Sequence, residues 1–161
     1  MLLFWECLIG VVLFTLIVVP MTLRDPIASI GDYPPAIREK CEALGLVAHR
    51  EKRFSKADMV RKGIAIIFFV VLFALLLRHV NGITAFLPAF LTAYTIWLVI
   101  AWYDALVLDC LWFCHTKGVR IPGTEDMKEY KDYGFHIRQS CIGTLLGLPA
   151  CLAAALVVTM L

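Results

Sequence analysis

Charge is scarce in this sequence and is confined to a few stretches. Only 17% of the 161 residues are Asp, Glu, Lys or Arg, whereas 61% are hydrophobic. Soluble domains contain roughly 45–50% apolar residues. A chain of this composition has more apolar surface than a water-soluble fold of its size can bury. The composition therefore excludes an ordinary soluble domain and predicts an integral membrane protein.

Recognisable catalytic and nucleic-acid motifs are also missing. The sequence contains no Walker phosphate loop, no Gly-x-Ser-x-Gly, no His-Glu-x-x-His and no dinucleotide fingerprint. The net charge of +2 is small, and the absence of a basic recognition helix excludes nucleic acid as a partner. The six cysteines are scattered, so we expect no disulfide framework. The sequence names neither a reaction nor a cofactor.

Four apolar segments are long enough to cross a bilayer, which needs about 20 residues of helix. The first has no Lys or Arg before it and no small-residue cleavage pattern after it, so we expect a retained helix rather than a signal peptide. Asn81-Gly82 is a turn signal between the second and third segments. The predicted fold is all-α, a polytopic four-helix bundle forming one domain over residues 1–161, with spans at about 2–21, 63–80, 83–113 and 137–161.

The basic residues predict the orientation of these spans. Of the 15 Lys and Arg residues, only Arg78 lies outside the two long loops, 22–62 and 114–136, and their immediate flanks. Because cytoplasmic loops are enriched in Lys and Arg, both loops are predicted to be cytoplasmic and both termini to lie outside. The expected location is the cell membrane.

The first loop contains the pattern of a short amphipathic helix. Pro34-Pro35 precedes residues 36–44 and Gly45 follows them, which matches the usual places of Pro and Gly around a helix. We expect this helix to lie on the inner leaflet. The basic block 50–53 would then meet anionic lipid headgroups, and Ser55-Lys56-Ala57-Asp58 would cap the second span. The simpler alternative is that these charges only set the orientation. The residues expected on the apolar face are Ile37, Cys41 and Leu44.

Ionisable residues inside spans are costly and commonly functional. Near the outer ends of the first two spans, Glu6 and Arg78 are at matching depths, so we predict a structural ion pair between them. An outer gate or ligand site is the alternative interpretation.

A second polar group is predicted at the inner end of the third span. Asp104 and His115 are separated by eleven residues, which leaves them about 20° apart on an α-helix. A short helix is expected at 125–133, capped by Thr124, and it would fold the second loop back over this end. Carboxylates and histidines gathered in a partly dehydrated site can perform acid–base chemistry. The candidate acid–base residues are Asp104, Asp109, His115 and His136, and the candidate ligand-binding residues are Arg120, Glu125, Asp126, Tyr130 and Arg138.

Metal binding is a weaker hypothesis for the same region. Cys110, Cys114 and His115 offer soft ligands, but their spacing is not a recognised zinc pattern, and buried thiols often serve as small apolar residues. A haem held between His115 and His136 is a further alternative. A purely structural interfacial network explains the same residues without any ligand.

Two longer runs carry a resemblance. WFCHTKGVRIPGTEDM, at 112–127, and YPPAIREKCEALGL, at 33–46, resemble small four-helix membrane proteins of anaerobic Gram-positive bacteria. The resemblance covers the whole chain and implies a membrane location but no activity.

Three functions remain open at this point. The first is a ligand-binding or acid–base site at the cytoplasmic interface. The second is a structural or interaction subunit of a membrane complex, and the third is an oligomeric small transporter or channel. Because four helices bury little surface alone, we expect a homo-oligomer or a complex subunit, and Gly143 and Gly147 form a small-xxx-small pattern that favours close helix packing.

Overall fold

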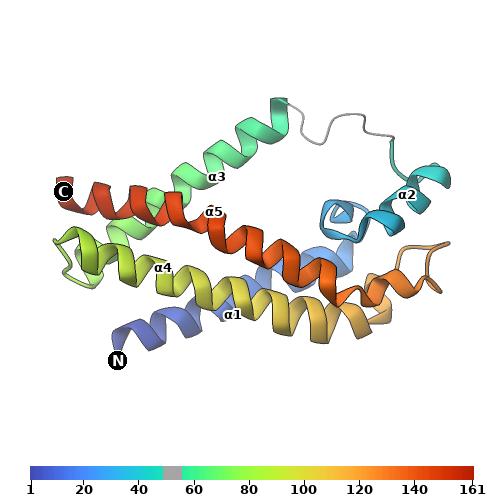
Figure 1. Cartoon of the computed structure of the whole chain (residues 1–161), viewed down its shortest axis with the longest axis horizontal. Coiled ribbons are helices and arrows are strands. Elements are labelled where there is room, and N and C mark those ends of the chain that lie inside the picture. Colours follow the sequence, from blue (N-terminus) through green and yellow to red (C-terminus); the bar gives the residue numbers. More distant parts are fainter. Residues whose placement is uncertain (49–55) are drawn as a thin grey trace. The chain divides into compact units, whose positions relative to one another are not determined.

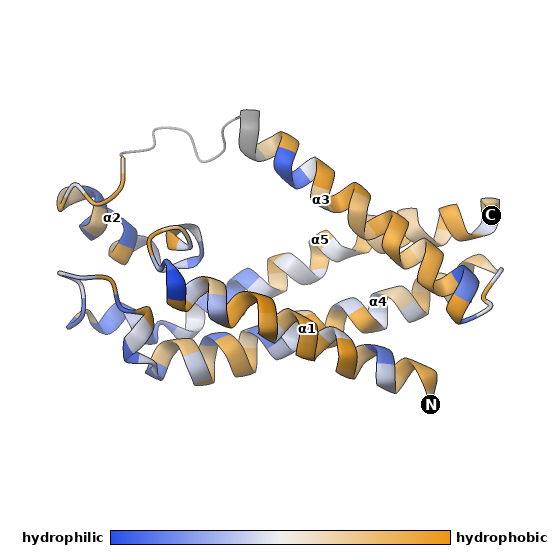
Figure 2. Ribbon diagram, turned by 180° about the vertical axis from the view of Figure 1, so that it is seen from behind, coloured by the Kyte–Doolittle hydropathy of each residue, from blue (hydrophilic) through white to orange (hydrophobic). Residues whose placement is uncertain are grey.

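The computed structural model describes residues 1–48 and 56–161, with side chains from residue 59 onward in the second part. Within these ranges the chain is helical and contains no strand (Figure 1). The four long elements are α1 (Leu2–Arg24), α3 (Lys56–Leu75), α4 (Phe86–Tyr103) and α5 (Tyr133–Met160). Each belongs to a helical run long and apolar enough to cross a membrane, so the predicted all-α membrane fold is confirmed. Hydrophobic residues line these helices, and hydrophilic residues gather at the connections (Figure 2).

Two of the long helices change their winding near one end. The helix that begins as α3 continues as the π-helical segment η2 (Leu76–Val80). The one that begins as α4 continues as the π-helical segment η3 (Asp104–Trp112) and the short 3₁₀ segment η4 (Phe113–His115). π-Helices are rare, usually limited to a single turn, and frequent at functional sites. In this chain the two π segments contain ionisable residues that the sequence places inside or beside the spans.

The fourth span begins earlier than the sequence predicts. α5 starts at Tyr133 rather than near residue 137, because Asp132 caps it. The Oδ1 atom of Asp132 accepts a hydrogen bond from the backbone N–H of Phe135 at 2.9 Å, which satisfies one of the free donors at a helix N-terminus. The helix therefore includes polar residues that the apolar run alone does not contain.

The described residues form two compact units, and the boundary between them passes through α1, α4 and α5. Unit 1 comprises Met1–Leu8, residues 56–99 and Ile142–Leu161; unit 2 comprises residues 9–48 and 100–141. Unit 1 contains the hairpin and both ends of the chain. Unit 2 contains residues 22–48 of the first predicted cytoplasmic loop and the whole of the second, 114–136, so these parts belong to one folded body, whereas residues 56–62 of the first loop belong to unit 1.

In unit 1 the tight turn between η2 and α4 forms as predicted. Gly82 has a φ of 65°, a left-handed conformation that glycine adopts without steric cost. The N–H of Asn81 donates to the carbonyl of Leu76 at 3.1 Å, and the N–H of Ile83 donates to that of Leu77 at 2.9 Å. The turn brings the helices before and after it together, since the rings of Phe69 and Trp97 meet edge to face at 5.0 Å.

Trp97 also joins α4 to α5 within unit 1. Its indole N–H donates to the carbonyl oxygen of Gly143 at 3.2 Å. The same ring lies against Gly147, where an added methyl group would overlap the indole. Gly143 has open space at its own Cβ position. The predicted Gly143/Gly147 pattern therefore serves contact between two helices of this chain, and Gly147 is the position that requires glycine.

In unit 2 a hydrophobic core joins the two loops. The hydroxyl of Tyr33 in the first loop donates to the carbonyl of Val119 in the second at 2.7 Å. Burial raises the pKa of Tyr33 above its usual range, so the hydroxyl stays protonated as this bond requires. The buried residues of this loop core are Tyr33, Ile37, Cys41, Phe113, Cys114, Val119, Ile121 and Tyr130.

A helix forms in the first loop where one was predicted, and protein covers most of its apolar face. Its location on the inner leaflet stays a prediction. α2 spans Pro35–Ala43 and is followed by Gly45, whose φ is 72°. The N–H groups of Gly45 and Leu46 close the helix end by donating to Glu42 and Cys41 at 3.0 Å each, a Schellman arrangement. Of the expected apolar face, Ile37 and Cys41 are fully buried in the loop core, while Leu44 is 46% exposed. Most of the face thus contacts protein. The basic block 50–53 and the Ser55 cap lie outside the described residues.

The predicted helix at 125–133 is wrong. Only a 3₁₀ turn, η6 (Lys128–Lys131), forms there. Thr124 does not cap a helix, because its hydroxyl donates to the carbonyl of Ile121 at 2.8 Å and lies 2.7 Å from the hydroxyl of Tyr130. Burial of Tyr130, which also accepts from the N–H of Ile121 at 2.9 Å, keeps this segment in a compact loop.

Candidate functional site

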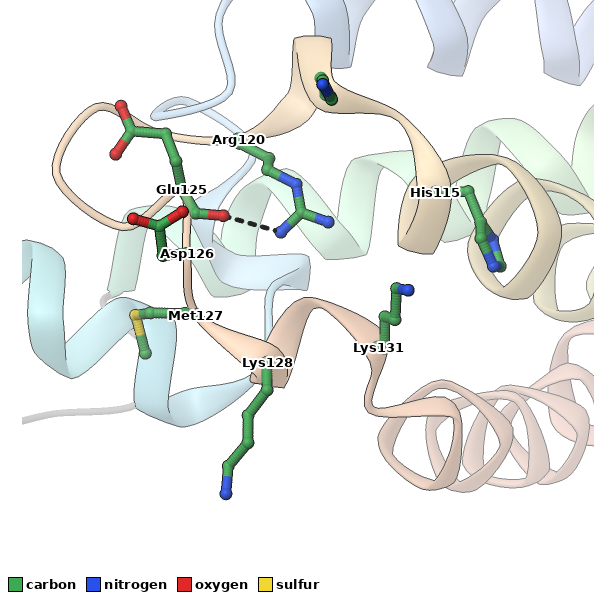
Figure 3. A pocket seen from close by; sticks show the side chains of 8 residues that line it. His115, Arg120, Glu125, Asp126, Met127, Lys128 and Lys131 are labelled. Carbon is green, nitrogen blue, oxygen red and sulfur yellow. Dashed lines mark hydrogen bonds between the residues drawn. The ribbon is translucent and has the colours of Figure 1, made fainter.

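An open hollow of about 690 Å³ lies in unit 2, beside the last residue of the third span (Figure 3). Four cationic side chains line it against two carboxylates, together with one histidine and one methionine. Basic groups that are this dense around one space make it attractive to an anion. The lining residues are His115, Lys117, Arg120, Glu125, Asp126, Met127, Lys128 and Lys131.

Arg120 is the most firmly held of the cations. Its guanidinium carbon lies 4.4 Å from the centre of the Tyr130 ring, a cation–π contact. One of its nitrogens, Nη1, donates to the carbonyl oxygen of Glu125 at 3.1 Å (Figure 3). An arginine has five N–H donors, so this bond leaves most of them available. The ring and the carbonyl orient a planar group suited to bidentate binding of carboxylate or phosphate.

The two carboxylates contribute less negative charge to the hollow than their number suggests. The Oε2 atom of Glu125 accepts a hydrogen bond from the backbone N–H of Gly123 at 2.7 Å. In Figure 3 this carboxylate points away from Arg120, toward its own turn. Asp126 is exposed. The four cations still outnumber the two carboxylates, so the lining carries a net positive charge.

His115 marks the place where the span meets the hollow. One ring nitrogen, Nδ1, lies 3.0 Å from the carbonyl oxygen of Leu111, and the other, Nε2, lies 3.3 Å from the hydroxyl of Tyr133. Both nitrogens therefore have partners. His115 is exposed and closes one side of the hollow.

A second polar feature of unit 2 is buried. Nδ1 of His136, at the start of α5, lies 3.1 Å from Oδ2 of Asp109 in η3. The side chain of His136 is 3% exposed and that of Asp109 is 29% exposed. The rings of Phe113 and Phe135 lie on His136, each with its centre 5.3 Å from the imidazole centre. Nε2 of His136 is buried and has no hydrogen-bond partner among the described residues.

The structure divides the predicted inner cluster instead of gathering all of it. Arg120, Glu125, Asp126 and His115 line the hollow, and Tyr130 supports Arg120 from the loop core. Asp109 and His136 form the separate buried pair. Arg138 is exposed and is not among the lining residues of the hollow. Asp104 is half-buried in η3.

The predicted angle between Asp104 and His115 assumes a regular α-helix, but the helix between them is not uniformly α-helical. The estimate of about 20° assumes 3.6 residues per turn, but residues 104–112 are π-helical and 113–115 are 3₁₀. A π-helix has wider turns, and a 3₁₀-helix has tighter ones. The directions of side chains along this stretch therefore differ from those on a regular helix.

The predicted metal site does not form. Among the residues that the structure describes, no three His, Cys, Asp or Glu side chains come together as a metal site would require. Cys114 is completely buried in the loop core, whereas His115 faces the hollow. The haem alternative also fails, because His136 is enclosed behind Phe113 and Phe135 while His115 is exposed.

The outer polar residues of unit 1 have partners other than those predicted. Oε2 of Glu6 accepts a hydrogen bond from the side-chain amide of Asn81 at 3.1 Å. Arg78 donates instead to the main-chain oxygen of Leu161 at 3.4 Å, where a cation is favoured by the negative end of a helix. The prediction of a Glu6–Arg78 ion pair is therefore wrong.

Two polar side chains in the middle of the third span donate hydrogen bonds to backbone carbonyl groups, one in α5 and one in the same helix. The hydroxyl of Tyr94 donates to the carbonyl of Thr144 at 3.3 Å, and that of Thr95 donates to Leu91 in its own helix at 2.7 Å. Both bonds satisfy side-chain donors within unit 1.

Sequence reasoning did not identify Lys117, Lys128 and Lys131 as site residues. In the sequence these three lysines indicate only that the loops are cytoplasmic. Nothing in their spacing predicts that they line one hollow. The available signal was the high density of cations in the short second loop.

Comparisons with protein-family models, curated proteins and solved structures found no match.

Proposed function

We propose that this chain is a multi-pass protein of the cell membrane that binds the phosphate of an anionic lipid headgroup in the basic hollow of unit 2. The observation that carries the proposal is the lining of that hollow, where four cations meet two carboxylates. Arg120 supplies a preset guanidinium, held by Tyr130 and the carbonyl of Glu125. Lysines act on phosphate as mobile point charges, and arginine adds paired hydrogen bonds.

The depth of the hollow favours a lipid over a free anion. His115 lines it and is also the last residue of the candidate span Phe86–His115. A group at the end of a span lies near the headgroups of the bilayer. Met127 adds an apolar surface to the lining, which a lipid acyl chain would contact and a free anion would not. Basic residues in this position bind anionic headgroups with about 1 kcal/mol each.

The orientation is inferred from the same charges. We place both loops in the cytoplasm because all the basic residues except Arg78 lie in or beside them. Residues 22–48 of the first loop fold together with the second loop in unit 2, which supports a common side for both. The inner leaflet, where anionic lipids are abundant, is then the leaflet that the hollow meets.

The proposal can be tested by ligand-induced stabilisation of the detergent-solubilised protein. The three ligands are short-chain phosphatidylglycerol, short-chain phosphatidylcholine and inorganic phosphate. A ligand present at 100 times its Kd stabilises the folded state by about 2.7 kcal/mol, which corresponds to a rise in melting temperature of about 5–11 °C for a chain of this size. We expect this rise with phosphatidylglycerol and little change with phosphatidylcholine.

Two triple variants make the test specific. Lys117→Gln, Arg120→Gln and Lys131→Gln together remove cations of the hollow, and we expect them to abolish the rise. The matched control replaces three exposed cations outside the hollow, Arg24, Lys40 and Arg138, by Gln, and should keep it. Stabilisation by inorganic phosphate without phosphatidylglycerol would overturn the lipid as the ligand. No stabilisation by either would overturn the anion site.

A further inference from the structure

The buried pair of Asp109 and His136 is separate from the basic hollow. Neither residue lines the hollow. The Phe113 ring contacts His136, the Tyr130 ring contacts Arg120, and the centres of the two rings are 6.1 Å apart. The pair therefore has its own surroundings, and its chemistry does not depend on the anion site.

The hydrogen bond to Asp109 determines what the rest of the imidazole can do. A carboxylate only accepts hydrogen bonds when ionised, so Nδ1 of His136 carries the proton at 3.1 Å from Oδ2. In the neutral ring Nε2 is then an acceptor with a free lone pair. This atom is buried and has no partner among the described residues. A carboxylate holding one nitrogen fixes the tautomer and increases the basicity of the other.

The backbone that presents Asp109 is unusual as well. Asp109 lies in η3, a nine-residue π-helical segment, whereas most π-helical segments are single turns. Because the winding sets the direction of each side chain, the π segment determines where the Asp109 carboxylate points. A strained or rare backbone conformation is often found at functional sites. An ion pair that only held η3 and α5 together would not require a π-helical segment.

The two rings that contact His136 differ in exposure. Phe113 is buried in the loop core, whereas Phe135 is half-buried and lies at the start of α5, next to His136. The Asp109 side chain is 29% exposed, so its charge is reached by solvent. Phe135 is therefore the more exposed of the two rings that contact the imidazole.

We propose that Asp109 and His136 form an acid–base pair in which Nε2 of His136 accepts the proton of a water molecule or hydroxyl group admitted beside Phe135. In this step the O–H bond breaks and an N–H bond forms at Nε2, while the oxygen keeps the bonding electrons. The positive charge that arises on the imidazole is stabilised by the Asp109 carboxylate. Among the described residues, the other ionisable groups near the pair include Asp104 on η3, the thiols of Cys110 and Cys114, and Asp132, whose carbonyl accepts from the N–H of His136 at 3.4 Å.

The proposal is tested by the reactivity of Nε2 in the full-length protein. Diethyl pyrocarbonate acylates unprotonated imidazole nitrogens, and mass spectrometry of the peptides gives a separate rate for each histidine. We expect slow but measurable acylation of His136 in the wild-type protein. Phe135→Ala should increase that rate, and Asp109→Asn, which keeps the shape but removes the charge, should lower it about tenfold. The exposed His115 is the internal reference, and its rate should stay unchanged.

A second measurement needs no variant. Nitrogen-15 NMR of the histidine-labelled wild-type protein at neutral pH should show His136 protonated at Nδ1 and unprotonated at Nε2. A proton on Nε2 would overturn the proposal. So would a His136 that resists acylation in both the wild-type protein and Phe135→Ala, since the pair would then only hold two helices together.

Discussion

The hydroxyl of Tyr33 donates a 2.7 Å hydrogen bond to the backbone carbonyl of Val119, 86 residues further along the chain. This bond joins the first loop to the second inside the loop core. Tyr33 is 3% exposed and Val119 is fully buried, so neither group can exchange its partner for water. The bond is therefore a direct reporter of whether the two loops fold as one unit.

We predict that Tyr33→Phe destabilises unit 2 without altering unit 1. The substitution keeps the ring but leaves the carbonyl of Val119 without its donor, and an unpaired buried polar group costs about 1–3 kcal/mol. Denaturant unfolding, followed by a fluorophore attached in the second loop, measures the change. An unfolding midpoint equal to that of the wild-type protein would contradict the assigned bond.

We also predict that unit 2 loses stability in alkali. Burial raises the pKa of Tyr33 above the value of about 10 that it has in the unfolded chain. A group with a raised folded-state pKa contributes its full stability below the unfolded-state pKa and loses it as the pH rises toward the folded-state pKa. Stability should therefore fall above pH of about 10, and this dependence should be weaker in Tyr33→Phe. An equal alkaline loss in both proteins would assign the effect to other groups.

A pair of glycine substitutions tests the helix contact in unit 1. At Gly147 an added methyl group would overlap the indole of Trp97, whereas at Gly143 it meets nothing. Gly147→Ala should therefore cost about 1–3 kcal/mol through overpacking, while Gly143→Ala should be neutral or stabilising. Thermal unfolding of the two variants in the same detergent gives the comparison. Equal effects would show that Trp97 does not pack on Gly147.

Cysteine labelling tests the burial of α2. Cys41 is fully buried, and burial raises the pKa of its thiol, so both access and reactivity are low. Peptide mass spectrometry after maleimide treatment should find Cys41 unlabelled until unit 2 opens. The matched control is Ala43→Cys on the exposed side of the same helix, which should react at once. Prompt labelling of Cys41 would mean that α2 lies on the membrane surface and not against the loop core.

The spans and α2 were predictable because local rules determine them. The thickness of the bilayer sets the length of an apolar helix, and Pro35 and Gly45 mark the ends of α2 through their own backbone preferences. These features depend on neighbouring residues, so one sequence is sufficient to locate them. The prediction of one domain over the whole chain stays a prediction, since the contacts separate two units.

The site was predictable only in part because tertiary contacts decide it. Asp109 and His136 were both candidates, but their pairing depends on the π-helical conformation of η3, which the sequence does not predict. Thr124 looks like a helix cap in the sequence, yet its hydroxyl is engaged by Ile121 and Tyr130. Glu6 and Arg78 match in depth, but depth does not specify direction around a helix, and Glu6 pairs with Asn81 instead.

Native mass spectrometry of the purified protein tests the anion site most directly. The protein is equilibrated with equal amounts of phosphatidylglycerol and phosphatidylcholine, and the lipids that stay bound are counted for each variant. The wild-type protein and the Arg24, Lys40 and Arg138 control should retain phosphatidylglycerol selectively, and the Lys117, Arg120 and Lys131 variant should lose that selectivity. Equal retention of the two lipids by the wild-type protein, or unchanged selectivity in the hollow variant, would contradict a lipid-phosphate site in this hollow.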